Sequence, residues 1–158
     1  MINWRTDRIG SALRGENPTV LARLDTGFAV IGDSQFLPGY CVLLVDDPQV
    51  EHLTDLPRPR RLSFLADMEL LGEAVSIVAA RRDPAFSRMN YQILGNLDPY
   101  LHAHVHPRYG WERSEAAARP ITHYPAEIRN APENRLGPQH DELRAELVRE
   151  INRLYTSL

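Results

Sequence analysis

The chain has 158 residues, a formal net charge of -3 at pH 7 and 43% hydrophobic residues. This length and composition predict a single globular domain, residues 1–158. Its charges are interspersed and it has no apolar run long enough to cross a bilayer, so we expect neither a nucleic-acid polymer nor a membrane as a partner.

The first third of the chain is predicted to consist mainly of strands. A hairpin is expected around the turn Asp25-Thr26-Gly27, and an unbroken apolar strand follows the turn-rich residues 33–39. Cys41 lies in that strand and is the one cysteine of the chain, so no internal disulfide can form. Together with an N-terminus that lacks a signal-peptide h-region, it indicates a reduced, cytoplasmic location. The expected elements are a helix over 3–13 and strands over 19–24, 28–31 and 40–45.

The rest of the chain alternates long helices with two more strands. A helix over about 60–82 carries an apolar stripe spaced by three and four residues, namely Phe64, Met68, Leu71, Val75 and Val78. Strands are expected over 87–94 and 101–106, and a last amphipathic helix over about 139–155. This order predicts an α+β fold, in which one long helix and a C-terminal helix pack on an antiparallel sheet.

Three histidines alternate along the last predicted strand. Side chains on a strand point to opposite faces in turn, so Leu101, Ala103 and Val105 share one face while His102, His104 and His106 share the other. The apolar face can pack under the long helix. The opposite face then presents a row of imidazoles about 6.6–7 Å apart at the backbone.

This histidine row admits three interpretations. Imidazole titrates near neutral pH and can act as nucleophile, base or acid, so the row favours attack on phosphorus, with a neighbouring histidine protonating the leaving oxygen. Two histidines spaced by two residues also suit a zinc ion, with a third ligand from another strand. The third interpretation is a solvated, histidine-rich edge strand. The chain contains no lysine, so any phosphate must be bound by arginine, histidine, hydroxyls or backbone amides.

The segment His102–His106, read as histidine and apolar residues in alternation, resembles the motif of the histidine triad (HIT) family. Other segments are similar to this family in the same order: Gly32-Asp33-Ser34 before Pro38-Gly39-Tyr40, then Leu94-Gly95-Asn96, and Pro107-Arg108 after the histidines. The resemblance covers about residues 17–112 and leaves residues 113–158 as a C-terminal extension that ends in a helix. It implies a HIT-like sheet, an enzyme, and a homodimer with an extended sheet.

The resemblance implies roles for three further residues. Asp33 would bind the ribose hydroxyls, Asn96 would lie near the α-phosphate, and Arg108 would contact substrate. The residues alone also allow other roles: Asp33 and Asn96 suit ordinary turns, and Arg108 could form an ion pair with Glu112.

The register of the triad can be read in two ways. Read literally, His102, His104 and His106 form the triad and His104 is the nucleophile. Aligned on Pro107-Arg108, the family pattern makes His102 the nucleophile and His104 the last member, with Tyr100 in place of the first histidine. Tyr40 also replaces a histidine that in many members supports the first triad histidine. We favour His102, and both registers keep His102 and His104 in the site.

The function predicted from the resemblance is a nucleotide hydrolase or nucleotidyl transferase. It would act at the α-phosphate of a dinucleoside polyphosphate, a nucleoside phosphoramidate or a similar AMP derivative, through a nucleotidyl-histidine intermediate. No tightly bound cofactor or metal is expected, although a divalent cation could arrive with a polyphosphate. Two alternatives stay open: a nucleotide-binding module with little turnover, and a histidine-ligated zinc hydrolase.

Overall fold

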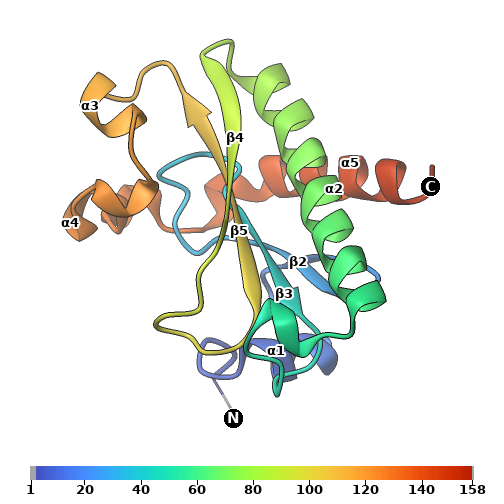
Figure 1. The fold of residues 1–158 in the computed structure, drawn as a ribbon. Helices are drawn as coiled ribbons and strands as arrows, with labels where there is room; N and C mark the ends of the chain where they lie inside the picture. The colour runs from blue at the N-terminus through green and yellow to red at the C-terminus, as the bar shows by residue number, and fades with distance from the viewer. Residues whose placement is uncertain (1–2, 158) are drawn as a thin grey trace.

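The computed structural model describes residues 3–157 and has an α+β fold built on one antiparallel sheet (Figure 1). The five strands lie in the order β1-β2-β3-β5-β4, so the strand that carries the histidines is interior. The strands are β1 (Val20–Arg23), β2 (Gly27–Ile31), β3 (Cys41–Val45), β4 (Phe86–Ile93) and β5 (His102–Tyr109).

The two long helices cover one face of this sheet. The 25-residue α2 packs on β3, β4 and β5, and α5 packs on α2 and β1. No helix within residues 3–157 is both long and apolar enough to span a membrane. The α-helices are α1 (Arg8–Leu13), α2 (Arg58–Arg82), α3 (Ser114–Ala117), α4 (Ala126–Arg129) and α5 (Asp141–Tyr155).

The core lies between the sheet and these two helices, as the apolar periodicity predicted. Leu101, Ala103 and Val105 are at most 1% exposed and belong to the same apolar cluster as the α2 stripe. Within the stripe, Phe64, Leu71, Val75 and Val78 are fully buried and Met68 is partly buried. Because alternate residues of a strand face opposite ways, burial of this side of β5 directs all three histidines to the other face.

Two elements differ from their predicted bounds by three residues or more at one end. The first helix begins at Arg8 rather than Asn3, because the Asn3 side chain accepts a hydrogen bond from the Arg5 amide and holds this segment in a turn. Strand β5 continues through Pro107 to Tyr109, although proline cannot donate to a sheet. The pairing of β3 with β5 ends at Val105, so Pro107 lies where β4 is its sole neighbour.

The segment between β5 and α5 lies away from α2. In Figure 1, α3 and α4 are on the opposite side of the molecule from α2, and the loop between β2 and β3 runs close to them. The backbone N–H of Leu136 donates a hydrogen bond to the backbone carbonyl of Asp33. The backbone N–H of Gln35 donates one to the backbone carbonyl of Asn134. The residues that follow the histidine strand therefore fold back over the loop that precedes β3.

Candidate functional site

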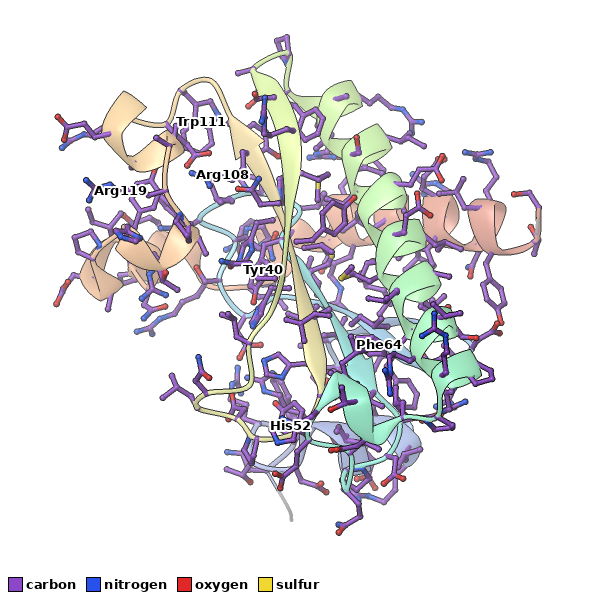
Figure 2. The ribbon with its side chains drawn as sticks, in the orientation of Figure 1. Tyr40, His52, Phe64, Arg108, Trp111 and Arg119 are labelled. Carbon is purple, nitrogen blue, oxygen red and sulfur yellow. The ribbon has the colours of Figure 1, made fainter. Side chains whose placement is uncertain are left out.

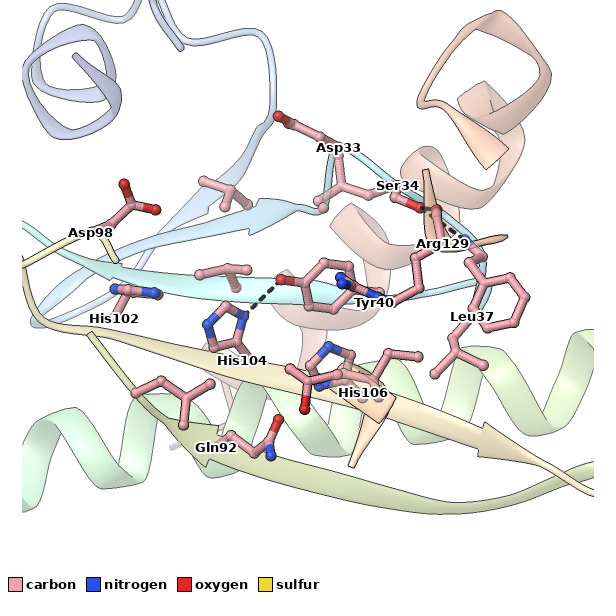
Figure 3. Close-up of a pocket in the computed structure, with 18 of the residues that line it drawn as sticks. Asp33, Ser34, Leu37, Tyr40, Gln92, Asp98, His102, His104, His106 and Arg129 are labelled. Carbon is pink, nitrogen blue, oxygen red and sulfur yellow. Dashed lines mark hydrogen bonds between the residues drawn. The ribbon is translucent and has the colours of Figure 1, made fainter. Parts of the chain in front are cut away.

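A cavity of about 310 Å³ opens on the sheet face opposite α2, and all three histidines of β5 line it (Figure 3). Its walls come from distant parts of the chain: α1, β2 and the loop that follows it, β3, the end of β4, and the C-terminal segment. The cavity is therefore a product of the whole fold, with the histidine strand as its floor.

Of the three histidines, His102 has the hydrogen bond that most directly shows which ring nitrogen carries the proton. Its Nδ1 lies 2.8 Å from the backbone carbonyl oxygen of Tyr100. A carbonyl oxygen can only accept, so Nδ1 carries the proton of the neutral ring and Nε2 keeps its lone pair. The side chain lines the cavity while the residue is only 7% exposed. This bond leaves the Nε2 lone pair of His102 available at the cavity.

His104 is bonded to a tyrosine from the preceding loop. Its Nδ1 lies 2.7 Å from the Tyr40 hydroxyl. Burial of the ring and the charge of His102 lower the pKa of His104 to about 4, so it is neutral at pH 7. Burial also raises the pKa of Tyr40, which keeps its hydroxyl proton. When that hydroxyl donates to Nδ1, the imidazole proton resides on Nε2, which can then donate to a substrate atom.

His106 is the most enclosed member of the row. Its ring stacks on Tyr40 with centroids 4.3 Å apart and an interplanar angle of 2°. Burial is the largest cause that lowers its pKa to about 3, and the neighbouring His104, Arg108 and Arg129 lower it further. Its Nδ1 is buried and has no hydrogen-bond partner among the described residues. His106 is therefore a neutral imidazole with an unmet hydrogen-bonding group.

The loop that supplies Tyr40 is held by one buried glutamine. Gln35 donates from its amide nitrogen to the carbonyls of Gly32 and Tyr40, and its amide oxygen accepts from the Gly39 amide. Gly39 has a backbone φ of 99°, which residues other than glycine rarely adopt. This tight turn delivers the Tyr40 ring onto the histidine row.

Asp33 lines the cavity as predicted, but its carboxylate is already paired. Arg8 of α1 holds both carboxylate oxygens, at 2.6 and 3.3 Å. A ribose hydroxyl bound by Asp33 would have to share it with this guanidinium. The sequence analysis did not include Arg8, which lies 25 positions earlier in the chain.

Asn96 and Arg108 are not placed at the cavity. Asn96 is exposed in the loop before β5 and does not line it. The amide side chain that does line it is Gln92, which stands opposite His104 in the pairing of β4 with β5. The alternation of β4 could have identified Gln92 once its register against the histidine strand was known.

Arg108 forms the ion pair with Glu112 that was the alternative to substrate binding. The guanidinium donates to both Glu112 oxygens, to the Asn90 side chain, and to the carbonyls of Ala116 and Arg119. Both side chains of the pair are at most 5% exposed. In Figure 2, Arg108 lies beside β5 on the side of α3 and Arg119. The substrate-binding role predicted for Arg108 is therefore corrected: its donors are used to hold the C-terminal segment.

The C-terminal extension, to which no role had been assigned, forms a wall of the cavity. Ile121, Thr122, Arg129 and Asn130 line it. Phe36 packs edge-on against Tyr124 with ring centroids 4.8 Å apart, and the Tyr124 hydroxyl donates to Glu112. Nothing local in the sequence indicates this contact, because it joins residues nearly ninety positions apart.

Among the described residues, the histidines are not grouped with other side chains into a three-ligand metal site. Within the described part of the chain, no three His, Cys, Asp or Glu side chains are grouped so that they could hold a metal ion. His102 and His104 therefore lack the third protein ligand that a catalytic zinc usually has.

Comparison with known proteins gives a consistent structural result. No protein-family model matches the sequence, and no curated protein matches it either. Solved structures do match. A histidine triad protein from Marinobacter aquaeolei VT8 aligns with a TM-score of 0.67 and 18% identity, over 85% of this chain and 89% of the other.

Two further solved structures extend the likeness over nearly the whole chain. A histidine triad protein from Sinorhizobium meliloti 1021 has a TM-score of 0.69 and 13% identity, and covers 95% of this chain and 96% of its own. A hypothetical histidine triad nucleotide-binding protein from Sulfolobus tokodaii strain 7 has a TM-score of 0.66 and 12% identity, over 93% of each chain. The chain therefore has the fold of histidine triad proteins, including its C-terminal extension.

Proposed function

We propose that this chain with a histidine triad fold is a nucleotide hydrolase or nucleotidyl transferase that acts at an α-phosphate. The observation that carries the proposal is the bond from His102 Nδ1 to the Tyr100 carbonyl, which leaves Nε2 with a lone pair at the cavity. This geometry favours the register in which His102 is the nucleophile and Tyr100 takes the place of the first histidine.

In the proposed first step, His102 Nε2 forms a bond to the α-phosphorus. The bond from phosphorus to the leaving oxygen or nitrogen breaks, and its electron pair stays on the leaving atom. His104 Nε2 donates a hydrogen bond that stabilises the charge developing on this atom, while the Tyr40 hydroxyl holds the other ring nitrogen. Any proton that the leaving atom takes up comes from water. The product is a nucleotidyl-histidine.

In the second step, water attacks the same phosphorus and the bond to His102 breaks. The electron pair of that bond returns to Nε2, the proton of the attacking water passes to solvent, and a nucleoside monophosphate is released. Gln92, opposite His104 in the sheet, is placed to donate its amide to a phosphoryl oxygen. It takes the part that the sequence analysis assigned to Asn96.

The proposal includes the cellular setting expected from the sequence. It describes a cytoplasmic homodimer whose substrate is a small nucleotide. His102 and His104 suffice for both steps, so no tightly bound cofactor is required, and a divalent cation is compatible with a polyphosphate substrate.

The test is turnover of AMP phosphoramidate and of diadenosine tetraphosphate by the wild type, His102→Ala and His104→Ala. We expect His102→Ala to abolish both AMP release and the covalent adduct seen by mass spectrometry. Loss of the hydrogen bond from His104 in His104→Ala should reduce turnover by about 10²–10³-fold. His123→Ala is the matched control, because His123 is exposed and does not line the cavity.

Each outcome of this test selects one reading of the site. An adduct on His104 would establish the literal register and refute His102 as the nucleophile. Nucleotide binding without AMP release or adduct would favour the binding module. Stoichiometric zinc that is lost with activity on chelation would favour the zinc hydrolase.

A further inference from the structure

The end of the cavity farthest from His102 has its own chemical character. His106 and Tyr40 form its floor and side, and Arg129 reaches it from the C-terminal segment, from which Thr122 also lines the cavity. In Figure 3, Arg129, Ser34 and Leu37 lie at this end, while His102 and Asp98 lie at the other. The cavity is therefore long enough for a ligand to extend from the nucleophile to Arg129.

Arg129 is held in place through its Nε and its carbonyl, which leaves its two terminal nitrogens as donors. Its Nε donates to the Tyr124 carbonyl at 3.1 Å, and the Ser34 hydroxyl donates to the Arg129 carbonyl. Tyr124 is fixed in turn by its hydroxyl bond to Glu112. Among residues 3–157, no side chain or carbonyl accepts from the two terminal nitrogens of Arg129. These are the nitrogens with which a guanidinium binds a phosphate in bidentate fashion.

The carboxylates near the Arg129 end of the cavity are already paired with other groups. Asp33 is paired with Arg8, and Asp98 lies at the other end beside His102. Glu112 is bound by Arg108 and Tyr124. The charge of Arg129 acts on the enclosed His106, whose Nδ1 has no partner among the described residues. A positive charge and an unpaired hydrogen-bonding atom therefore meet at this end, where both nearby carboxylates are held by other arginines.

We propose that Arg129, His106 and Thr122 form a subsite for the phosphate chain of an anionic leaving group. This inference rests on the proposed function. With the α-phosphorus at His102, the leaving group departs on the side opposite Nε2, passes the hydrogen-bond donor His104 and continues along the strand toward His106. A leaving group that carries phosphates would place them against Arg129. The preferred substrates are then nucleoside or dinucleoside polyphosphates rather than phosphoramidates with an uncharged leaving group.

The kinetic test uses the ratio of kcat/KM for a polyphosphate substrate to kcat/KM for a phosphoramidate. We would measure kcat/KM for diadenosine tetraphosphate and for AMP phosphoramidate in the wild type, Arg129→Gln, Arg129→Lys and Arg135→Gln. Arg135 is the matched control, since it is an exposed arginine of the same segment that does not line the cavity. We expect the ratio of the two values to fall at least tenfold in Arg129→Gln, to recover partly in Arg129→Lys, and to stay unchanged in Arg135→Gln. An unchanged ratio in Arg129→Gln would overturn the proposal.

A binding measurement tests the subsite independently of catalysis. Inorganic triphosphate would be titrated into the wild type, Arg129→Gln and Arg135→Gln by calorimetry. A loss of at least tenfold in affinity confined to Arg129→Gln supports the subsite, and equal affinities, or no binding to the wild type, refute it. If the wild type binds triphosphate through Arg129 but releases no AMP, the proposed hydrolase fails while the subsite stands.

Discussion

At the scale of single residues, three histidines with the same spacing have three different environments. His102 is oriented by the Tyr100 carbonyl just before its strand and His104 by a tyrosine hydroxyl from another segment. His106 is stacked and buried, and its Nδ1 has no partner among the described residues. The alternation of the strand brings the rings together. Their partners then determine that one ring presents a lone pair, one can present a proton, and one contributes a neutral surface.

The buried neutral histidines predict an acid-sensitive fold. The pKa of an unfolded histidine is about 6.5, whereas that of His106 is lowered to about 3 and that of His104 to about 4. Below pH 6.5 the unfolded chain therefore binds protons that the folded chain does not. The free energy of unfolding should fall by about 1.4 kcal/mol per pH unit for each of the two histidines as the pH drops from 6.5 toward these values.

The variant His106→Leu measures the contribution of His106 to this pH dependence of the free energy of unfolding. Urea unfolding followed at several pH values between 7 and 4.5 should show a slope against pH that is smaller by about 1.4 kcal/mol per unit than in the wild type. Leucine suits the site because His106 is 6% exposed and its ring packs face to face on the Tyr40 ring. Parallel curves for the two proteins would refute the assigned protonation of His106.

At the scale of elements, the C-terminal extension is fastened to the histidine strand by one buried ion pair. Arg108 lies on β5, Glu112 follows it, and together they bind the backbone and side chains of the segment that forms the cavity wall. The Tyr109 amide also donates to Glu112. The position of Arg129 over the cavity thus depends on a pair that contacts no substrate.

Breaking this pair should loosen the wall. Arg108→Gln leaves Glu112 buried without its cation, and we expect a loss of about 3–5 kcal/mol in the free energy of unfolding. Trypsin should then cleave after Arg129 and Arg135 faster than in the wild type. Arg14→Gln is the control, because the Arg14 side chain is 42% exposed in its ion pairs and its loss should leave the free energy of unfolding nearly unchanged. Equal stability and equal proteolysis of the two variants would contradict the anchoring role.

At the scale of the whole molecule, the sheet divides two tasks between its faces. One face is closed by α2 and α5 and contains the core, and the other carries the cavity under the β2–β3 loop and the C-terminal segment (Figure 1). The eight-residue β4 forms one edge of the sheet, and no other strand of residues 3–157 pairs with its outer side. An unpaired edge of this length is a natural place for sheet extension between two copies.

The expected homodimer can be tested by mass. Light scattering coupled to size exclusion should give twice the 18.0 kDa of the chain at micromolar concentration. A dimer joined through β4 should also protect the backbone amides of β4 from hydrogen exchange at high protein concentration and expose them on dilution. A concentration-independent mass of 18.0 kDa would rule out the dimer.

The features that the sequence determined by itself are those with a local period. The alternation of residues 101–106 separated the buried face of β5 from the histidine face, and the spacing of three and four along α2 identified the side that packs on it. Such patterns follow from the geometry of a single strand or helix, so they can be read without a partner. They were sufficient for the α+β class and for the histidine row.

The partners of the row were decided by the tertiary structure alone. Arg8 and Arg129 stand more than a hundred positions apart in the chain, yet both line the cavity, and Gln92 joined it through the register of β4 against β5. Arg108 was equally suited to a phosphate and to Glu112, and only the buried geometry assigned its donors. Charge and hydrogen-bonding capacity are properties of a residue, but the group that satisfies them is chosen by contacts between distant segments, which no local pattern records.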